Sequence, residues 1–152
     1  MSNAAFPAVM HLLRVQAVLE ERFSGELGSV HGLSLKEALL LMHLQSAPLS
    51  RLSRVELSKR LNVSPSTVTR MAAPLEKTGR VTRDVDPRDA RLAYVTLSAA
   101  GLQVIIEARR TLVRLAGEVF KDRWADGEIL NLSNLLARLT ASQRGNVAES
   151  DA

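Results

Sequence analysis

Cysteine is absent from the 152 residues of this sequence, which excludes disulfide bonds, cysteine-ligated zinc, iron–sulfur clusters and thiol-based redox sensing. Aromatic residues make up only 3% of the chain, so a buried core has to be built from aliphatic side chains. The longest purely apolar run, Ala38–Met42, is far shorter than the roughly 20 residues that cross a bilayer. The N-terminal residues also lack the pattern of a signal peptide. We therefore expect a cytoplasmic protein without membrane contact.

Motifs for catalysis and metal binding are missing as well. The sequence contains no Walker loop, no G-x-G-x-x-G and no G-x-S-x-G. Its three histidines, His11, His31 and His43, fall in different segments without the spacing of a metal site. Residues 84–89 are similar to a calcium-binding loop only superficially, because Val95 stands where the bidentate glutamate is needed. We expect no enzymatic activity, no cofactor and no metal.

Positive charge is concentrated in the middle third of the chain. Residues 47–96 carry ten basic and five acidic side chains, whereas residues 1–46 carry three and four and residues 97–152 carry seven of each. A basic segment between nearly neutral ones is typical of a module that binds phosphates. Charge alone is explained equally well by a solvated basic surface.

Hydrophobic spacing and capping residues predict a mainly α protein with one small β-hairpin. Ser34 and Ser53 are each followed three residues later by glutamate, which predicts capping boxes. Ser64-Pro65 predicts another helix start, and Gly79 the end of that helix. The expected strands, 81–85 and 91–97, are joined by a polar turn over 86–90, and the expected helices cover 7–27, 34–47, 53–61, 65–78, 99–124 and 126–141.

The short helix 53–61, a tight turn and the helix 65–78 have the pattern of a helix-turn-helix, whose second helix enters the DNA major groove. Val68, Met71, Ala72 and Leu75 form its apolar face. On the outward face small hydroxyl groups permit close approach, and Arg70 has the planar fork that binds guanine or phosphate. The N-terminal amides favour a phosphate near Ser64. An amphipathic helix packed on a protein partner has the same pattern. The outward residues are Ser66, Thr67, Thr69, Arg70, Ala73 and Lys77.

The predicted hairpin carries basic residues at and near its tip. Arg88 lies in the turn, and Arg83 and Arg91 lie on the flanking strands. A guanidinium at this place can enter an A·T-rich minor groove. Asp86 and Asp89 are expected to form ion pairs with Arg88 and Arg91, each contributing only about 0–1 kcal/mol, so that their role is to stiffen the loop.

Four stretches together resemble the MarR family of winged-helix transcriptional regulators: Leu57–Arg70, Leu75–Val81, Asp86–Arg91 and Val95–Gly101. The D-x-R-D-x-R wing, followed by a strand and a Ser-x-x-Gly helix start, is the most specific of them. Arg80 and Ala90 depart from the family pattern, which usually has an apolar residue and another arginine there. The resemblance implies a winged helix-turn-helix domain with dimerisation helices from both termini. The expected divisions are N-terminal helices over 1–46, a DNA-binding lobe over 47–97, C-terminal dimerisation helices over 98–142 and a flexible tail over 143–152.

The resemblance also implies roles for individual residues. Ser66, Thr67 and Arg70 would lie at base edges, Ser64 and Thr69 on the DNA backbone, and Arg88 in the minor groove. The expected function is that of a homodimer on a pseudo-palindromic operator, most often a repressor, with half-site centres about 10 bp apart. The resemblance further implies a small aromatic or lipophilic effector, whose site the sequence does not identify. The alternative is a winged-helix module that binds protein and not DNA.

Overall fold

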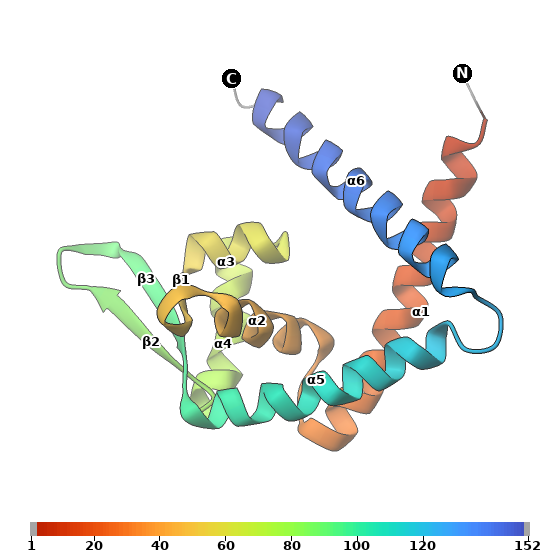
Figure 1. The fold of residues 1–152 in the computed structure, drawn as a ribbon. Helices are drawn as coiled ribbons and strands as arrows, with labels where there is room; N and C mark the ends of the chain where they lie inside the picture. Colours follow the sequence, from red (N-terminus) through yellow and green to blue (C-terminus); the bar gives the residue numbers. More distant parts are fainter. Residues whose placement is uncertain (1–2, 151–152) are drawn as a thin grey trace. The chain divides into compact units, whose positions relative to one another are not determined.

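The computed structural model describes residues 3–150, with side chains over 3–89 and 92–142 (Figure 1). The chain divides into two compact units, Met1–Val113 and Arg114–Ala152. Within the described residues no helix is both long and apolar enough to cross a membrane. The elements in chain order are α1 (Ala5–His31), α2 (Leu35–Ser46), the 3-10 turn η1 (Pro48–Ser50), β1 (Arg51–Ser53), α3 (Arg54–Leu61), α4 (Pro65–Lys77), β2 (Val81–Asp86), β3 (Asp89–Leu97), α5 (Ala99–Val119) and α6 (Asp126–Ser150).

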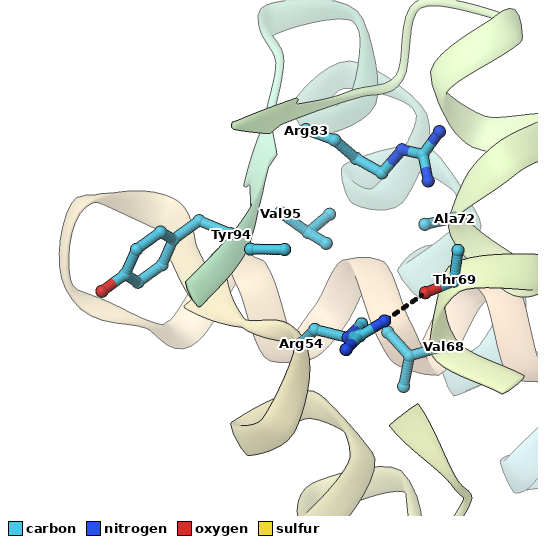
Figure 2. Close-up of a pocket in the computed structure, with 8 residues that line it drawn as sticks. Arg54, Val68, Thr69, Ala72, Arg83, Tyr94 and Val95 are labelled. Carbon is cyan, nitrogen blue, oxygen red and sulfur yellow. Dashed lines mark hydrogen bonds between the residues drawn. The ribbon is translucent and has the colours of Figure 1, made fainter. Parts of the chain in front are cut away.

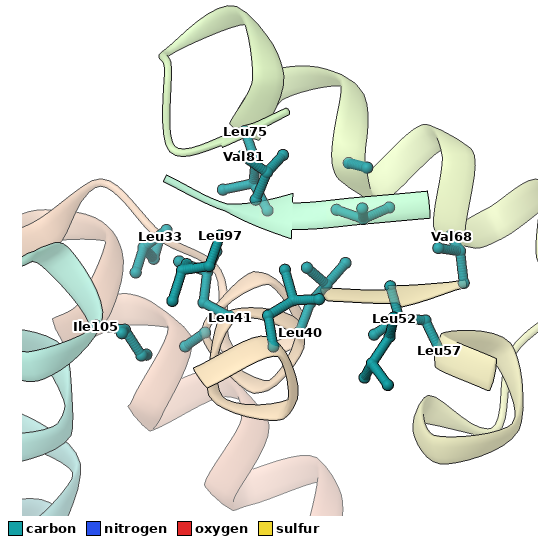
Figure 3. Close-up of a cluster of buried hydrophobic side chains, with 14 of the residues drawn as sticks. Leu33, Leu40, Leu41, Leu52, Leu57, Val68, Leu75, Val81, Leu97 and Ile105 are labelled. Carbon is teal, nitrogen blue, oxygen red and sulfur yellow. The ribbon is translucent and has the colours of Figure 1, made fainter. Parts of the chain in front are cut away.

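The core of the first unit is aliphatic, as the scarcity of aromatic residues predicted. Leucines of α2 meet side chains from α3, α4, the strands and α5 (Figure 3). At about 25 cal/mol per Å² of buried apolar surface, each of these leucines stabilises the fold by about 2 kcal/mol. The largest fully buried side chains of this unit are Leu27, Leu33, Leu40, Leu41, Leu44, Leu57, Leu75, Ile105, Val68 and Val81.

The β-sheet has three antiparallel strands in the order β1-β3-β2. The predicted hairpin is confirmed, with a tighter turn than expected, because Asp86 and Asp89 already pair and leave only Pro87 and Arg88 between the strands. The third strand, β1, was not predicted. It has only three residues, with Leu52 opposite Val95, and so it is too short for an alternating pattern to reveal it.

Serine side chains begin the helices where the sequence predicted. Ser34 has the complete capping box with Glu37. Ser53 accepts a hydrogen bond from the Glu56 N–H at 3.1 Å, but the Glu56 carboxylate instead accepts from Arg60 Nε at 3.2 Å. Only half of that predicted capping box is therefore formed.

Three helix ends were predicted wrongly. α1 passes through Gly25 and Gly28 and ends only at Gly32, whose φ of 65° is left-handed. α5 ends at Val119 and is about 32 Å long, because Asp122 has a φ of 66° that a right-handed helix cannot contain. α6 continues to Ser150 instead of ending near Ala141, and no proline interrupts its polar end.

Candidate nucleic-acid interface

The turn between α3 and α4 is only three residues long. α3 ends at Asn62, which adopts a left-handed φ of 54°, and the Val63 N–H donates to the Ser58 carbonyl at 3.0 Å. Ser64 then caps α4 by accepting from the Thr67 N–H, and Pro65 occupies the first helical position. Short polar residues therefore produce the break and restart that a helix-turn-helix requires.

The two faces of α4 differ as the sequence predicted. Val68, Ala72 and Leu75 are buried in the core of the first unit. Ser66 and Arg70 are exposed on the opposite face, and Thr67 is half-buried. The first turn of α4 holds no acidic residue, so no carboxylate opposes an incoming phosphate there.

Hydroxyl groups at the start of α4 bond to one another. The Ser64 Oγ lies 3.0 Å from the Ser66 Oγ and 2.9 Å from the Thr67 Oγ1. The Arg70 guanidinium donates to the Thr67 Oγ1 at 3.1 Å. Four of the predicted site residues therefore lie together, and the exposed Arg70 guanidinium is bonded to one of them.

Thr69 lies on a different side of α4, facing the sheet (Figure 2). Its Oγ1 donates to the Pro65 carbonyl at 3.3 Å and accepts from Arg54 Nη1 at 3.4 Å. Arg54 was not among the predicted site residues, and the Nε of its half-buried guanidinium is buried without a partner. Its place immediately after the Ser53 cap was the one signal that could have drawn attention to it.

Arg54 and Arg83 approach α4 from the two sides of a small cavity between α4 and the sheet (Figure 2). The cavity has a volume of about 120 Å³, room for a few water molecules and too little for a drug-sized ligand. Its walls are mostly apolar. The lining residues are Arg54, Val68, Thr69, Ala72, Arg83, Ala93, Tyr94 and Val95.

The hairpin tip projects away from α2, α3 and α4, with Arg88 exposed at the turn (Figure 1). The Arg88 backbone N–H donates to the Asp86 Oδ1 at 2.8 Å, a contact that stabilises tight turns. Asp86 therefore stiffens the loop through the backbone of Arg88, where the sequence predicted an ion pair with a side chain. Asp89 is half-buried opposite Asp86. The Arg91 side chain lies outside the described residues.

The Arg83 side chain is directed toward α4 and not toward the hairpin tip, because it has an acidic partner on that helix. Its guanidinium forms an ion pair with the Glu76 carboxylate on α4, so that it connects β2 to the end of that helix. A second cation is held against the sheet, because the Arg51 guanidinium lies 4.0 Å from the centre of the Tyr94 ring. Among the described residues of this surface, the exposed arginine of α4 is Arg70 and the exposed arginine of the hairpin turn is Arg88.

Comparison with known proteins agrees with this geometry. The MarR family model matches residues 33–92, which contain α2, α3, α4 and most of the hairpin. Over these residues the chain is similar to the MarR family. Its mainly helical fold with a small antiparallel sheet is the winged-helix fold seen in solved MarR family regulators.

Similar proteins match most of the length of this chain. The HTH-type transcriptional repressor YetL of Bacillus subtilis is 29% identical over 130 residues, which are 84% of this chain and 75% of YetL. The MarR family regulator Sco3205 of Streptomyces coelicolor was solved in complex with DNA. It matches this structure with a TM-score of 0.82 at 22% identity, and the match covers 93% of this chain and 89% of the Sco3205 chain. BpsR of Bordetella bronchiseptica, described as regulated in DNA binding by 6-hydroxynicotinic acid, has a TM-score of 0.76 at 20% identity over 88% of this chain and 98% of its own.

Proposed function

We propose that the protein is a sequence-specific regulator that binds double-stranded DNA, represses transcription and acts in the cytoplasm. The observation that carries this proposal is the outward face of α4, where Arg70 is exposed and held by Thr67 beside two serine hydroxyls. Such a face can enter the major groove, because its first two turns carry short side chains and one guanidinium with the geometry of a guanine contact.

Individual residues have distinct roles in this proposal. Ser66, Thr67 and Arg70 read base edges, and the cap residue Ser64 presents the N-terminus of α4 to a phosphate. Arg88 enters the minor groove from the wing. Thr69 and Arg83 act more indirectly than the family resemblance implies, since each has a partner within the lobe, Arg54 and Glu76 respectively.

A homodimer is part of the same proposal. α1 leaves large apolar side chains in contact with solvent on one helical face, with Phe6 72% and Leu13 57% exposed. α6 likewise has exposed leucines. Apolar surfaces of this kind are covered in a stable assembly. Two copies related by a twofold axis would bind an inverted repeat with half-site centres about 10 bp apart.

We further propose that the pocket between α2 and α5 of the first unit binds a small effector. The cavity has a volume of about 420 Å³ and is lined by Gln45, Ile106, Arg109, Arg110 and Val113. This volume suits a small aromatic compound. Two arginines favour an anion, and the Gln45 side-chain carbonyl, buried without a partner, would accept a hydrogen bond from a hydroxyl group. A hydroxylated aromatic acid meets these requirements.

Selection from a library of random duplexes tests the proposed DNA binding. We expect the protein to enrich an inverted repeat, and its affinity for that repeat to fall by about 10³–10⁵ between 50 and 200 mM salt if six to ten phosphates are contacted. Absence of binding at low salt would instead favour the protein-interaction module.

Calorimetry with hydroxybenzoates tests the effector pocket. We expect Arg109→Gln to weaken binding of these anions and to leave DNA affinity unchanged.

A further inference from the structure

Arg80 connects the end of α4 to the start of α5 through its backbone. Its N–H donates to the Leu75 carbonyl at 2.8 Å, which completes the cap of α4 around Gly79. Its carbonyl accepts from the Ser98 N–H at 3.1 Å. The backbone of this one residue is therefore bonded on both sides, to the helix that bears Arg70 and to the turn that precedes α5.

The Arg80 side chain extends to a third element, α1. Its Nη1 donates to the Gly32 carbonyl and its Nη2 to the His31 carbonyl, both at 3.1 Å. These acceptors lie at the C-terminus of α1, where carbonyls have no partner within the helix and the helix dipole attracts a cation. A planar guanidinium can bond both carbonyls at once, which a lysine ammonium on its flexible stem does less specifically.

Two further contacts make the connection stiff. A Cβ atom on Gly101 would lie 2.0 Å from the Arg80 carbonyl oxygen, so the first turn of α5 packs directly on this backbone. The His31 Nε2 and the Thr111 Oγ1 are 2.7 Å apart, which joins the end of α1 to α5 independently of Arg80. A rotation of α4 relative to α1 would have to break the two hydrogen bonds of the Arg80 guanidinium.

We propose that Arg80 is a positioning residue that determines how far apart the two α4 helices of a dimer are held. Through this distance it selects the spacing between operator half-sites. The inference rests on the proposed function, in which α1 takes part in dimerisation and α4 reads DNA. Arg80 itself does not read DNA in this scheme, because its guanidinium is directed at the carbonyls of α1.

Binding to a series of operators is the first test. Wild-type protein is expected to prefer one spacing over operators one base pair longer or shorter. Arg80→Leu should reduce that preference by about fivefold, the lower end of typical coupling between sites, and leave sequence preference within a half-site and the salt dependence unchanged. Arg80→Lys, which retains the charge, should be intermediate. Lys36→Leu removes a charge from the exposed surface of α2 and serves as the matched control.

A distance measurement on the DNA-free dimer is the second test. Because the chain has no cysteine, Ala73→Cys on the exposed face of α4 introduces a single attachment site for a spin label. We expect the distribution of distances between the two labels to broaden in Arg80→Leu and to keep its width in Lys36→Leu. Arg80→Lys, for which we expect an intermediate width, provides the test if Arg80→Leu does not fold.

The possible results separate this inference from the proposed function. An unchanged spacing preference and unchanged label distances in Arg80→Leu, with only a lower melting temperature, would overturn it and reduce Arg80 to a local cap of α1. A wild-type dimer that selects no inverted repeat would contradict the proposed function, while the label distances would still decide the role of Arg80. A monomeric wild-type protein would overturn both.

Discussion

The exposed faces of α1 and α4 belong to the same unit and have opposite chemistry. On α1 the exposed side chains include Phe6, Val9 and Leu13, which are large, apolar and without polar contacts to offer. At the start of α4 they include hydroxyl groups and a guanidinium that bond to one another. An apolar face is stabilised by removing water from it, whereas a polar face exchanges its bonds for those of a ligand. The difference supports the proposal that α1 contacts a second copy of the chain and α4 contacts DNA.

The largest effect is expected when a charge is placed on the apolar face of α1, which tests whether this face forms the dimer interface. We expect Leu13→Glu to weaken dimerisation by several kcal/mol, because an unpaired carboxylate would be buried in the interface, and DNA affinity should fall with it. Sedimentation at micromolar protein concentration measures the change. His11→Glu adds the same charge on the other side of α1 and is the control. A dimer of undiminished stability in Leu13→Glu would place the interface elsewhere.

The second prediction concerns base reading by α4. Arg70→Ala should cost about 1–3 kcal/mol of specific binding, since the guanidinium is the one long polar group in the first two turns of the outward face. Fluorescence anisotropy on the selected operator and on a scrambled duplex measures specific and non-specific binding separately. Arg70→Lys keeps the charge and lacks the planar fork, and it should recover non-specific affinity only. An unchanged operator preference in Arg70→Ala would show that this residue reads no base.

The third prediction separates the two roles of Ser64, as helix cap and as phosphate contact. Ser64→Ala should lower the free energy of unfolding by about 1 kcal/mol. Ser64→Asp retains the cap and adds a negative charge, so it should keep the melting temperature and lose DNA affinity. Ser34→Asp makes the same change at the cap of α2 and should affect neither quantity. Equal DNA affinity in Ser64→Asp and wild type would remove the N-terminus of α4 from the interface.

The smallest effect is expected at the wing. Arg88→Ala should weaken DNA binding by about 1 kcal/mol, and more on operators with A·T-rich flanks, where a narrow minor groove has the more negative potential. Binding to operators that differ only in their flanks measures this difference. An equal loss on G·C-rich flanks would rule out recognition of groove width by Arg88.

Much of the winged-helix lobe could be predicted from the sequence, because its signals are local. Ser34, Ser64 and Gly79 begin and end helices through bonds to residues within a few positions, and the two faces of α4 follow from spacing alone. The short strand β1 could not be predicted in this way. It exists because Leu52 pairs with Val95, a residue that is distant in the chain and close in the sheet.

Local sequence is enough to predict which residues cap the helices, which face of α4 is polar and that a basic hairpin follows it. The partners of the long cationic side chains, in contrast, depend on how the helices and strands pack in the folded protein. Arg54 turned toward Thr69, Arg83 toward Glu76 and Arg80 toward the end of α1. The reason is physical: a cap is chosen within one turn of helix, whereas a flexible guanidinium binds whichever acceptor the folded chain brings within its reach.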